Sequence, residues 1–336
     1  MQIYPMNSFP NPEMPKINQG DKMVLLGSCF SDNLGAAFEL DRVPVLYNPF
    51  GVVFHPLAMV KLLQRAIEKR YYAESDLRFE DRYYYSLEHH SALVTTSASS
   101  YLDQANALLD HLLDWIKEAK YLVLTFGSAW GYEFEGEVAA NCHKQDPRLF
   151  EKKLYSYTEM GSVCLDVIRQ IQELNPALTI AITVSPVLHL KDGWEGNEES
   201  KSHLVLLSSW LTKTLDNVYY LPVYEYVTRF LRSYEYFESD GTHPNQQAIS
   251  MIYQWVSQSI FSQRLNEQVE RWKAIRSSLN HKTLKPLSNA NFNFKKKLLS
   301  ELLDFIDQFG VNLDEEVKKL ESEIQRLEGE VNKLAK

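Results

Sequence analysis

Near its start the chain reads Met23-Val24-Leu25-Leu26-Gly27-Ser28-Cys29-Phe30-Ser31, and much of its architecture follows from these residues. A short apolar run closed by Gly is typical of a buried parallel strand that turns into a helix. The turn places Ser28 at the carboxyl end of the strand, where open α/β sheets bind ligands and where the N–H groups of the next helix are unpaired. Ser28 is therefore either a candidate nucleophile, with an oxyanion donor in its own N–H group, or simply an N-cap.

Length and composition are those of an ordinary globular protein. The 336 residues suit one large domain with appendages, and 45% hydrophobic and 24% charged residues allow a sizeable core. The formal net charge of −9 argues against a nucleic-acid partner, because phosphate contacts need clustered Lys and Arg. The same charge argues against an anionic membrane surface as partner.

The cysteines and the N-terminal segment indicate which cellular compartment to expect. Cys29, Cys142 and Cys164 are widely spaced and odd in number, so we expect no disulfide framework. Residues 1–22 are polar and proline-rich and lack the basic and apolar parts of a secretory signal, and no segment has the ~20 apolar residues that span a bilayer. These features favour the cytoplasm.

Apolar runs and amphipathic stretches alternate from residue 23 to residue 261. The runs predict strands at 23–27, 43–47, 121–126, 178–184 and 218–222, with helices at 32–40, 55–63, 101–120, 149–174, 200–215 and 246–261. Tyr-rich segments at 80–95 and 132–140 read as β-hairpin insertions. The alternation predicts a three-layer α/β/α fold with a doubly wound, mainly parallel sheet.

The C-terminal part falls outside this alternation. Residues 265–312 form a polar helical extension to the body, 1–264, and residues 313–336 carry a heptad repeat. Its seam consists of Leu313, Val317, Leu320, Ile324, Leu327, Val331 and Leu334. An isolated helix of this length is marginal in water, so we expect a partner helix, most simply in a homo-oligomer. The alternatives are an amphipathic helix docked back on the chain, or a tail without a role in the fold.

A second stretch, Asp240-Gly241-Thr242-His243-Pro244-Asn245, places a carboxylate three residues before a histidine. A carboxylate on one ring nitrogen fixes the tautomer of His243 and leaves the other nitrogen free to take a proton from a serine. In a doubly wound fold this loop lies at the same sheet edge as Ser28. Alone, the stretch is equally compatible with a helix-capping loop or half of a metal site; together with Ser28 it favours a serine hydrolase.

The order of these blocks resembles the SGNH (GDSL-like) hydrolase superfamily. Within it, residues 27–31 resemble the Gly-Ser-Cys-Phe-Ala motif of the GSCFA family, with Ser31 in place of Ala. Further similar blocks lie at 125–130, 141–144, 185–189 and 240–244. The resemblance covers about residues 21–261. It implies Ser28 as nucleophile, His243 as general base and Asp240 as the residue that orients His243.

The resemblance also implies an oxyanion hole, and here the chain departs from the superfamily pattern. The expected donors are the N–H group of Ser28, a donor of the second block, for which Gly51 or Asn48 is best positioned, and an Asn after the third strand. That block, expected as Gly-x-Asn-Asp, reads Gly127-Ser128-Ala129-Trp130, so Ser128 and Asn141 are the candidates to replace the Asn. Losing one oxyanion donor costs about 2.7–4 kcal/mol of transition-state stabilisation, so activity depends on a replacement.

Four side chains are expected to shape the substrate site: Asn48, Trp130, His143 and His189. Trp130 suits stacking on a sugar ring, and ordinary packing is the alternative. For each histidine the alternative is a loop residue with satisfied hydrogen bonds. We expect no metal, because Cys142, His143, His189 and Asp192 match no closed zinc pattern, and no cofactor.

The sequence thus predicts a serine hydrolase that cleaves an ester through an acyl-serine intermediate. By analogy with the family, the ester carries a short, acetyl-type acyl group on a carbohydrate. Two alternatives remain: a non-catalytic carbohydrate- or ligand-binding module with the same fold, and an assembly protein whose coiled coil is the functional part.

Overall fold

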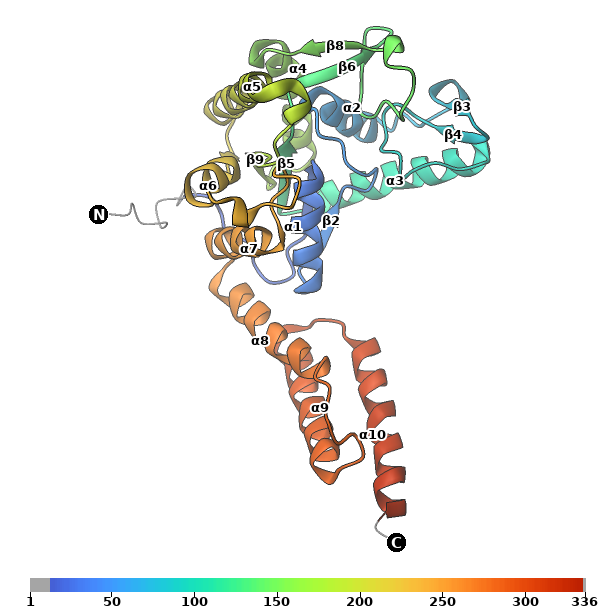
Figure 1. The fold of residues 1–336 in the computed structure, drawn as a ribbon, viewed down its shortest axis with the longest axis vertical. Coiled ribbons are helices and arrows are strands. Elements are labelled where there is room, and N and C mark those ends of the chain that lie inside the picture. The colour runs from blue at the N-terminus through green and yellow to red at the C-terminus, as the bar shows by residue number, and fades with distance from the viewer. Residues whose placement is uncertain (1–12, 335–336) are drawn as a thin grey trace, which may run out of the picture.

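The computed structural model describes residues 13–334, and a five-stranded parallel sheet lies at its centre (Figure 1). The strands are β1 (Met23–Gly27), β2 (Val45–Tyr47), β5 (Tyr121–Phe126), β9 (Thr179–Val184) and β10 (Val218–Tyr220), in the order β10-β9-β5-β1-β2. Strands β1, β5 and β9 are buried at every residue, as expected for parallel strands covered on both faces.

Helices cover both faces because successive strand residues point to opposite sides of the sheet. Val24 and Leu26 of β1 join the hydrophobic cluster on one face, whereas Met23 and Leu25 join the cluster on the other. The first face is covered by α2 (Pro56–Ile67), α3 (Ala98–Glu118), α4 (Tyr157–Leu174) and α5 (Gly193–Thr214), the second by α1 (Cys29–Leu40), α6 (Val223–Phe230) and α7 (Gln246–Ile260). The predicted three-layer α/β/α fold is confirmed.

Two small antiparallel sheets and several 3₁₀ turns are inserted among these elements. The sheets contain β3 (Arg78–Glu80) with β4 (Tyr83–Tyr85), and, in the order β7-β6-β8, β6 (Trp130–Phe134), β7 (Glu137–Ala139) and β8 (Glu151–Leu154). The 3₁₀ turns are η2 (Glu74–Asp76), η3 (Pro147–Leu149), η4 (Leu190–Asp192) and η5 (Tyr234–Tyr236). The hairpin expected over 80–95 is formed by residues 78–85, and Thr95 adds an isolated antiparallel bridge to Tyr84.

The helix predicted from residue 149 is wrong over its first part. Residues 151–154 form β8, which pairs with β6, and α4 begins only at Tyr157. Ser156 caps that helix: its hydroxyl accepts from the N–H of Glu159, whose carboxylate accepts from the N–H of Ser156. This capping box was the boundary signal inside the predicted helix.

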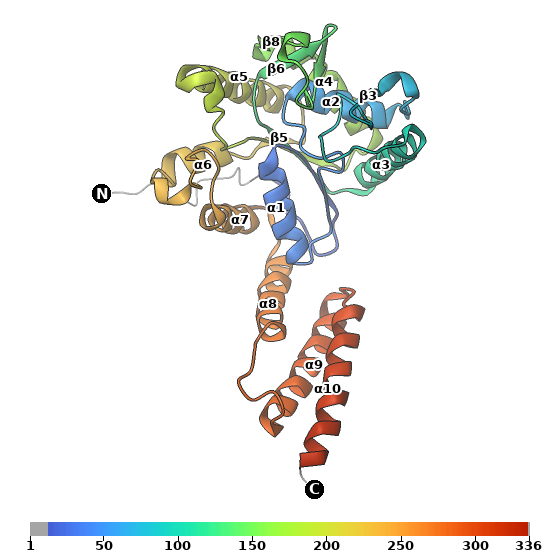
Figure 2. The same ribbon diagram turned by 45° about the vertical axis from the view of Figure 1, so that its right-hand side comes forward.

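The C-terminal part is a helical unit with its own core (Figure 2). It comprises α8 (Gln263–Leu279), α9 (Asn289–Phe309) and α10 (Asp314–Leu334). Leu320 and Ile324 of α10 are buried in one cluster with Leu302 and Phe305 of α9. The heptad residues of α10 therefore pack on α9 of the same chain. This arrangement corresponds to the alternative of an amphipathic helix docked back on the chain.

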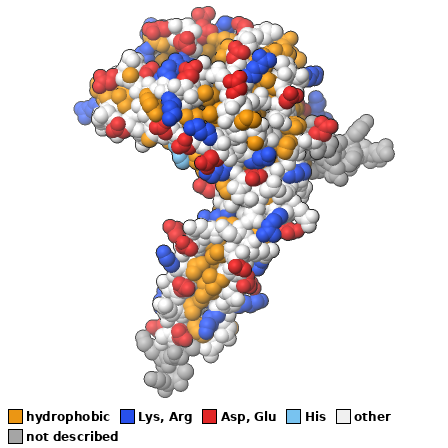
Figure 3. Space-filling model, turned by 180° about the vertical axis from the view of Figure 1, so that it is seen from behind, with side chains coloured by type: hydrophobic (Ala, Val, Ile, Leu, Met, Phe, Trp, Pro, Cys, Tyr) orange, Lys and Arg blue, Asp and Glu red, His pale blue; other side chains and the backbone are white. Residues whose placement is uncertain are grey.

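A homo-oligomer formed through this unit remains a prediction. Figure 3 shows hydrophobic side chains gathered on one face of the helical unit, flanked by charged ones. The exposed large hydrophobic side chains of the unit are Leu284, Leu287 and Leu303, among the residues whose side chains are described. The unit thus retains apolar surface even though Leu313, Leu320, Ile324 and Leu327 of the seam are buried.

Polar contacts join the helical unit to the body at the end of α1. The indole Nε1 of Trp272 donates to the carbonyl of Leu40 at 2.8 Å. Arg276 donates to the buried carboxylate of Asp41 at 2.9 Å, and Asp41 also accepts from the hydroxyl of Tyr253 in α7. Burial makes this shared carboxylate expensive to leave unpaired, so the contact fixes the unit to the body.

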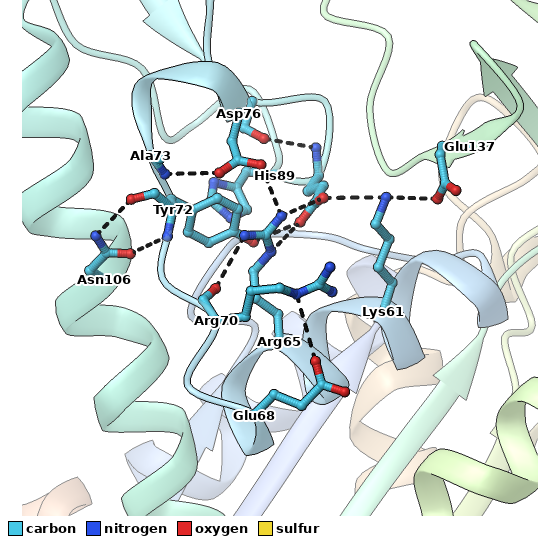
Figure 4. A network of polar contacts seen from close by, with 12 residues as sticks. Lys61, Arg65, Glu68, Arg70, Tyr72, Ala73, Asp76, His89, Asn106 and Glu137 are labelled. Carbon is cyan, nitrogen blue, oxygen red and sulfur yellow. Dashed lines mark hydrogen bonds and ion pairs between the residues drawn. The ribbon is translucent and has the colours of Figure 1, made fainter.

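A second buried network fixes the loop that follows β4 (Figure 4). Arg65 of α2 donates to both carboxylate oxygens of Glu88, at 3.0 and 3.1 Å, and to Asp76 at 3.1 Å. The hydroxyl of Tyr72 donates to Glu88, and Lys61 links Glu88 to a surface strand. A bidentate guanidinium–carboxylate pair of this kind holds its loop rigidly.

Candidate active site

The sheet order puts the end of β1 beside the end of β5, where the direction of chain progression reverses. In such folds the crevice at this reversal binds the ligand. Gly27 closes β1 with φ +141, and a Cβ atom there would lie 2.2 Å from the carbonyl oxygen of Thr125, so only Gly allows the strands to end this close together. Ser28 follows directly and lies at that position.

Ser28 caps α1 and has a second hydrogen bond. Its Oγ accepts from the N–H of Phe30 at 3.3 Å and donates to the Oγ of Ser185 at 3.1 Å. Ser185 follows β9, and both hydroxyls are buried. The capping interpretation of Ser28 is therefore correct as geometry, and it leaves the hydroxyl at the N-terminus of a helix, where negative charge is stabilised.

The predicted Asp–His pair is formed. Nδ1 of His243 lies 2.6 Å from Oδ2 of Asp240, and Oδ1 of Asp240 accepts from the N–H groups of Thr242 and His243. These backbone donors, together with the His243 ring, hold the pKa of Asp240 well below its usual range. The carboxylate thus stays ionised and fixes the ring of His243 through Nδ1.

The loop that carries the pair is tied to the exit of β9. The N–H of Leu188 donates to the carbonyl of Thr242 at 3.2 Å. This hydrogen bond joins the loop of Asp240 and His243 to the segment of Ser185, which is the hydrogen-bond partner of Ser28. His243 Nε2 has no hydrogen-bond partner among residues 13–334, and Ser28 donates to Ser185 rather than to His243.

Two of the predicted oxyanion donors are occupied. The N–H of Ser28 donates to the carbonyl of Thr125 at 3.3 Å, and the N–H of Gly51 donates to the carbonyl of Asn48 at 2.7 Å, closing a turn. In this arrangement neither N–H group is free for a substrate oxygen, and the oxyanion role expected of Ser28 and Gly51 stays a prediction. A substrate oxygen cannot use a donor that a tight turn already holds.

The other two candidates keep one free donor each. The hydroxyl of Ser128 accepts from the N–H of Trp130 and contacts Ser200, whereas the N–H of Ser128 has no partner in the described part of the chain. Asn141 accepts the N–H of His143 with Oδ1, and its amide Nδ2 has no hydrogen-bond partner between residues 13 and 334. The N–H group of Ser128 and Nδ2 of Asn141 are therefore the predicted donors that remain free for an oxyanion.

Asn48 and His143, expected to contact substrate, are engaged in the fold. Asn48 accepts the N–H of Gly27 at 2.8 Å and donates to Asp32 at 2.6 Å. Nε2 of His143 lies 3.0 Å from the carbonyls of both Ser86 and His89. Both side chains support backbone segments in this structure, and their role in substrate binding stays a prediction.

Trp130 and His189 lie closer to open space. Trp130 lines a cavity of about 160 Å³ with Phe54, His55 and Asn141, and its Nε1 donates to the carbonyl of Gly196 at 3.0 Å. The ring of His189 packs on Phe54, and burial lowers the pKa of His189 to about 4, so this ring is neutral at pH 7. Their roles in substrate binding stay predictions.

Sequence reasoning missed the polar face of α5. Lys201 is 1% exposed, and its ammonium donates to the carbonyls of Gly127 at 2.7 Å and Ser185 at 2.9 Å. Burial lowers the pKa of Lys201 to about 7. Ser200 donates or accepts at Ser128 and accepts the N–H of Ala129. The available signal was the pair Ser200-Lys201, which lies at helical spacing from the apolar residues Leu204 and Leu207 and so on the same, buried face of the helix.

Within the described residues, no three His, Cys, Asp or Glu side chains are grouped as metal ligands would be. Nor does any described helix combine the length and hydrophobicity needed to cross a membrane.

Two protein-family models match the chain. The GSCFA family model matches residues 22–255, which include Ser28, Asp240 and His243. The chain belongs to the GSCFA family. A second model, described as the GSCFA domain protein C-terminal domain, matches residues 272–326, so most of the helical unit also belongs to the family's pattern. No curated protein matches the chain.

Proposed function

We propose that this GSCFA protein is a serine hydrolase of the SGNH type that cleaves an ester bond. The observation that carries the proposal is the Asp240–His243 pair, formed at 2.6 Å on a loop joined to the segment whose Ser185 holds Ser28. A serine at a helix N-terminus, an oriented imidazole with a free Nε2 and an ionised carboxylate are the groups that acyl transfer needs.

The mechanism requires the Ser28 hydroxyl to exchange Ser185 for His243 Nε2 as its acceptor. Oγ then attacks the ester carbonyl while Nε2 takes its proton, and Asp240 stabilises the imidazolium that forms. Collapse of the tetrahedral intermediate breaks the ester C–O bond, and His243 returns the proton to the leaving alcohol. Water, deprotonated by His243, hydrolyses the acyl-serine and frees the acid.

The proposed substrate is a short acyl ester of a carbohydrate, as the family resemblance implies. The cavity bounded by Trp130 and Asn141 suits it, because an indole face stacks on a sugar ring and the free amide Nδ2 donates to an oxygen.

Hydrolysis of p-nitrophenyl acetate tests the proposal. Ser28→Ala should abolish turnover at this site, because it removes the proposed nucleophile. The substitution also removes an N-cap, worth about 1 kcal/mol, so Ser156→Ala, which removes the cap of α4, is the matched control. Equal rates for wild type and Ser28→Ala would reject the proposal.

A binding module is the second candidate, and one observation favours it. Ser28 is hydrogen bonded to Ser185 rather than to His243, and the Ser28 and Gly51 N–H groups are engaged. A fluorophosphonate separates the two candidates because it phosphonylates an activated serine without needing the natural substrate. Labelling of Ser28, located by peptide mass spectrometry, supports the hydrolase; binding of acylated sugars without labelling supports the module.

A further inference from the structure

Lys201 is buried at the candidate site without a carboxylate partner. Its ammonium contacts two neutral carbonyls, and no carboxylate of the described residues, 13–334, lies within ion-pair distance of it. A buried unpaired charge is costly, and burial accordingly lowers the pKa of Lys201 to about 7. An apolar side chain at this point of the core would avoid that cost, so the charge needs an explanation.

The two carbonyls that Lys201 contacts lie at the catalytic edge. Gly127 follows β5 and Ser185 follows β9, and the Ser185 hydroxyl is the one that holds Ser28. The titratable groups that act on Lys201 come from all sides: Cys29 beside Ser28, Glu198 on its own helix, His189 from the β9 exit, and the Tyr224 ring on α6 at 5.9 Å. The charge thus lies within electrostatic range of the nucleophile.

One peptide links Lys201 to a free donor. The carbonyl of Gly127 accepts from Lys201 at 2.7 Å, and the N–H of the same peptide belongs to Ser128. That N–H has no partner in the described part of the chain, whereas the Ser128 hydroxyl is held by Trp130 and Ser200. A cation on the carbonyl of a peptide polarises it and strengthens its N–H as a donor.

We propose that Lys201 is a positioning residue for the oxyanion hole: its ammonium polarises the Gly127–Ser128 peptide, and the Ser128 N–H then donates to the developing oxyanion. This arrangement takes the place of the Asn that the third block lacks. Lys201 acts through the peptide, and the same ammonium holds the Ser185 carbonyl, which keeps the ends of β5 and β9 in register around Ser28. The inference rests on the proposed serine hydrolase.

The rate of Ser28 phosphonylation by a fluorophosphonate tests this inference. In that reaction Ser28 Oγ forms a bond to phosphorus, fluoride leaves and His243 takes the hydroxyl proton. Lys201→Gln keeps two N–H donors for the carbonyls and removes the charge. We expect it to react about tenfold more slowly at pH 6.5, a smaller loss than removal of an oxyanion donor would cause. Ser202→Ala, exposed on the same helix, is the control and should react as wild type does.

The pH dependence distinguishes charge from packing. The ammonium is lost as pH rises through about 7, so the ratio of the wild-type rate to the Lys201→Gln rate should fall towards one between pH 6.5 and 9.5. Dividing the two rates cancels the other ionisations. A ratio of one at all pH values, or a constant ratio above one, would overturn the inference, the latter because it marks a purely structural role.

Two further outcomes are decisive. If wild type is not phosphonylated at Ser28 at any pH, the proposed hydrolase fails and this inference fails with it, whatever stands at position 201. If Lys201→Gln does not fold, as judged by its melting curve, the wild-type profile decides: a phosphonylation rate that does not fall between pH 7 and 9.5 overturns the role of Lys201.

Discussion

The carboxyl edge of the sheet and the C-terminal helical unit differ in what they bury. At the edge the buried side chains include Ser28, Ser128, Ser185, Asn197, Ser200 and Lys201. The core of the helical unit is aromatic and aliphatic, built around Trp272, Leu302 and Phe305. Polar burial costs stability unless every group is paired, and the proposed hydrolase would account for that cost at the sheet edge. In the helical unit the buried polar side chains, among the described residues, are Gln268 and Asn291, and packing dominates its core.

The largest effect should come from the polar region, at Asp240. Asp240→Asn keeps an oxygen for the N–H groups of Thr242 and His243, but its amide group cannot accept from Nδ1 of His243. The imidazole then loses its required tautomer, and we expect phosphonylation of Ser28 and p-nitrophenyl acetate hydrolysis to fall about 10⁴-fold.

Asp146→Asn is the matched control for this change. Asp146 is also an exposed loop carboxylate that accepts a backbone N–H two residues ahead, from Arg148 at 2.9 Å. Its substitution should leave both rates unchanged. A loss of less than tenfold in Asp240→Asn would show that His243 is not oriented by this carboxylate during the reaction, and the catalytic interpretation of the pair would have to be abandoned.

The second effect should be confined to the apolar region. Phe305 is fully buried in α9 and packs on Trp272 and Phe309, with ring centroids 5.8 and 5.0 Å away. Phe305→Ala should destabilise the helical unit by about 3–5 kcal/mol, through lost contacts and the cavity that is left. Hydrogen exchange over residues 263–330 would report the loss, and phosphonylation of Ser28 should keep its wild-type rate.

Leu303→Ala, at a half-exposed position of the same helix, controls for helix propensity and should have a small effect. If Phe305→Ala slows phosphonylation as strongly as it loosens the helices, the two regions are coupled. The contact of Arg276 with Asp41 would then be the route to examine first, because it joins α8 to the end of α1.

The sequence predicted the apolar framework better than the polar interior. The run ending at Gly27-Ser28 and the Asp240–His243 spacing are local patterns, so strand β1, the cap and the pair were all predictable. Strand β8 was missed because its charged residues, Glu151 to Lys153, pair at an edge and show no apolar run.

Contacts between residues that are far apart in the sequence could not be predicted from local patterns. Nothing in the residues around 200 announces that Lys201 meets the carbonyls of Gly127 and Ser185, because that contact depends on how α5 packs across two strand ends. The heptad seam of α10 was read as a sign of a second chain. The same pattern serves a helix of the same chain, and sequence periodicity does not distinguish the two.

The smallest predicted effect tests whether the buried charge lowers stability as the contrast between the regions requires. The pKa of Lys201 is lowered from 10.5 in the unfolded chain to about 7 in the fold, so between these values the unfolded state binds more protons. Stability therefore rises with pH across that window for wild type and not for Lys201→Met, in which the group is absent. We expect the free energy of unfolding of wild type, relative to that of Lys201→Met, to increase by about 1–3 kcal/mol between pH 7 and 9.5. This increase stays below the limit that one proton sets, about 1.4 kcal/mol per pH unit. Urea unfolding at several pH values measures this difference, and Lys213→Met, exposed on the same helix, should show no such change. If the difference in unfolding free energy between wild type and Lys201→Met stays constant over this range, the ammonium is solvated in the fold. The buried charge would then not destabilise the sheet edge, and the contrast with the helical unit would not extend to Lys201.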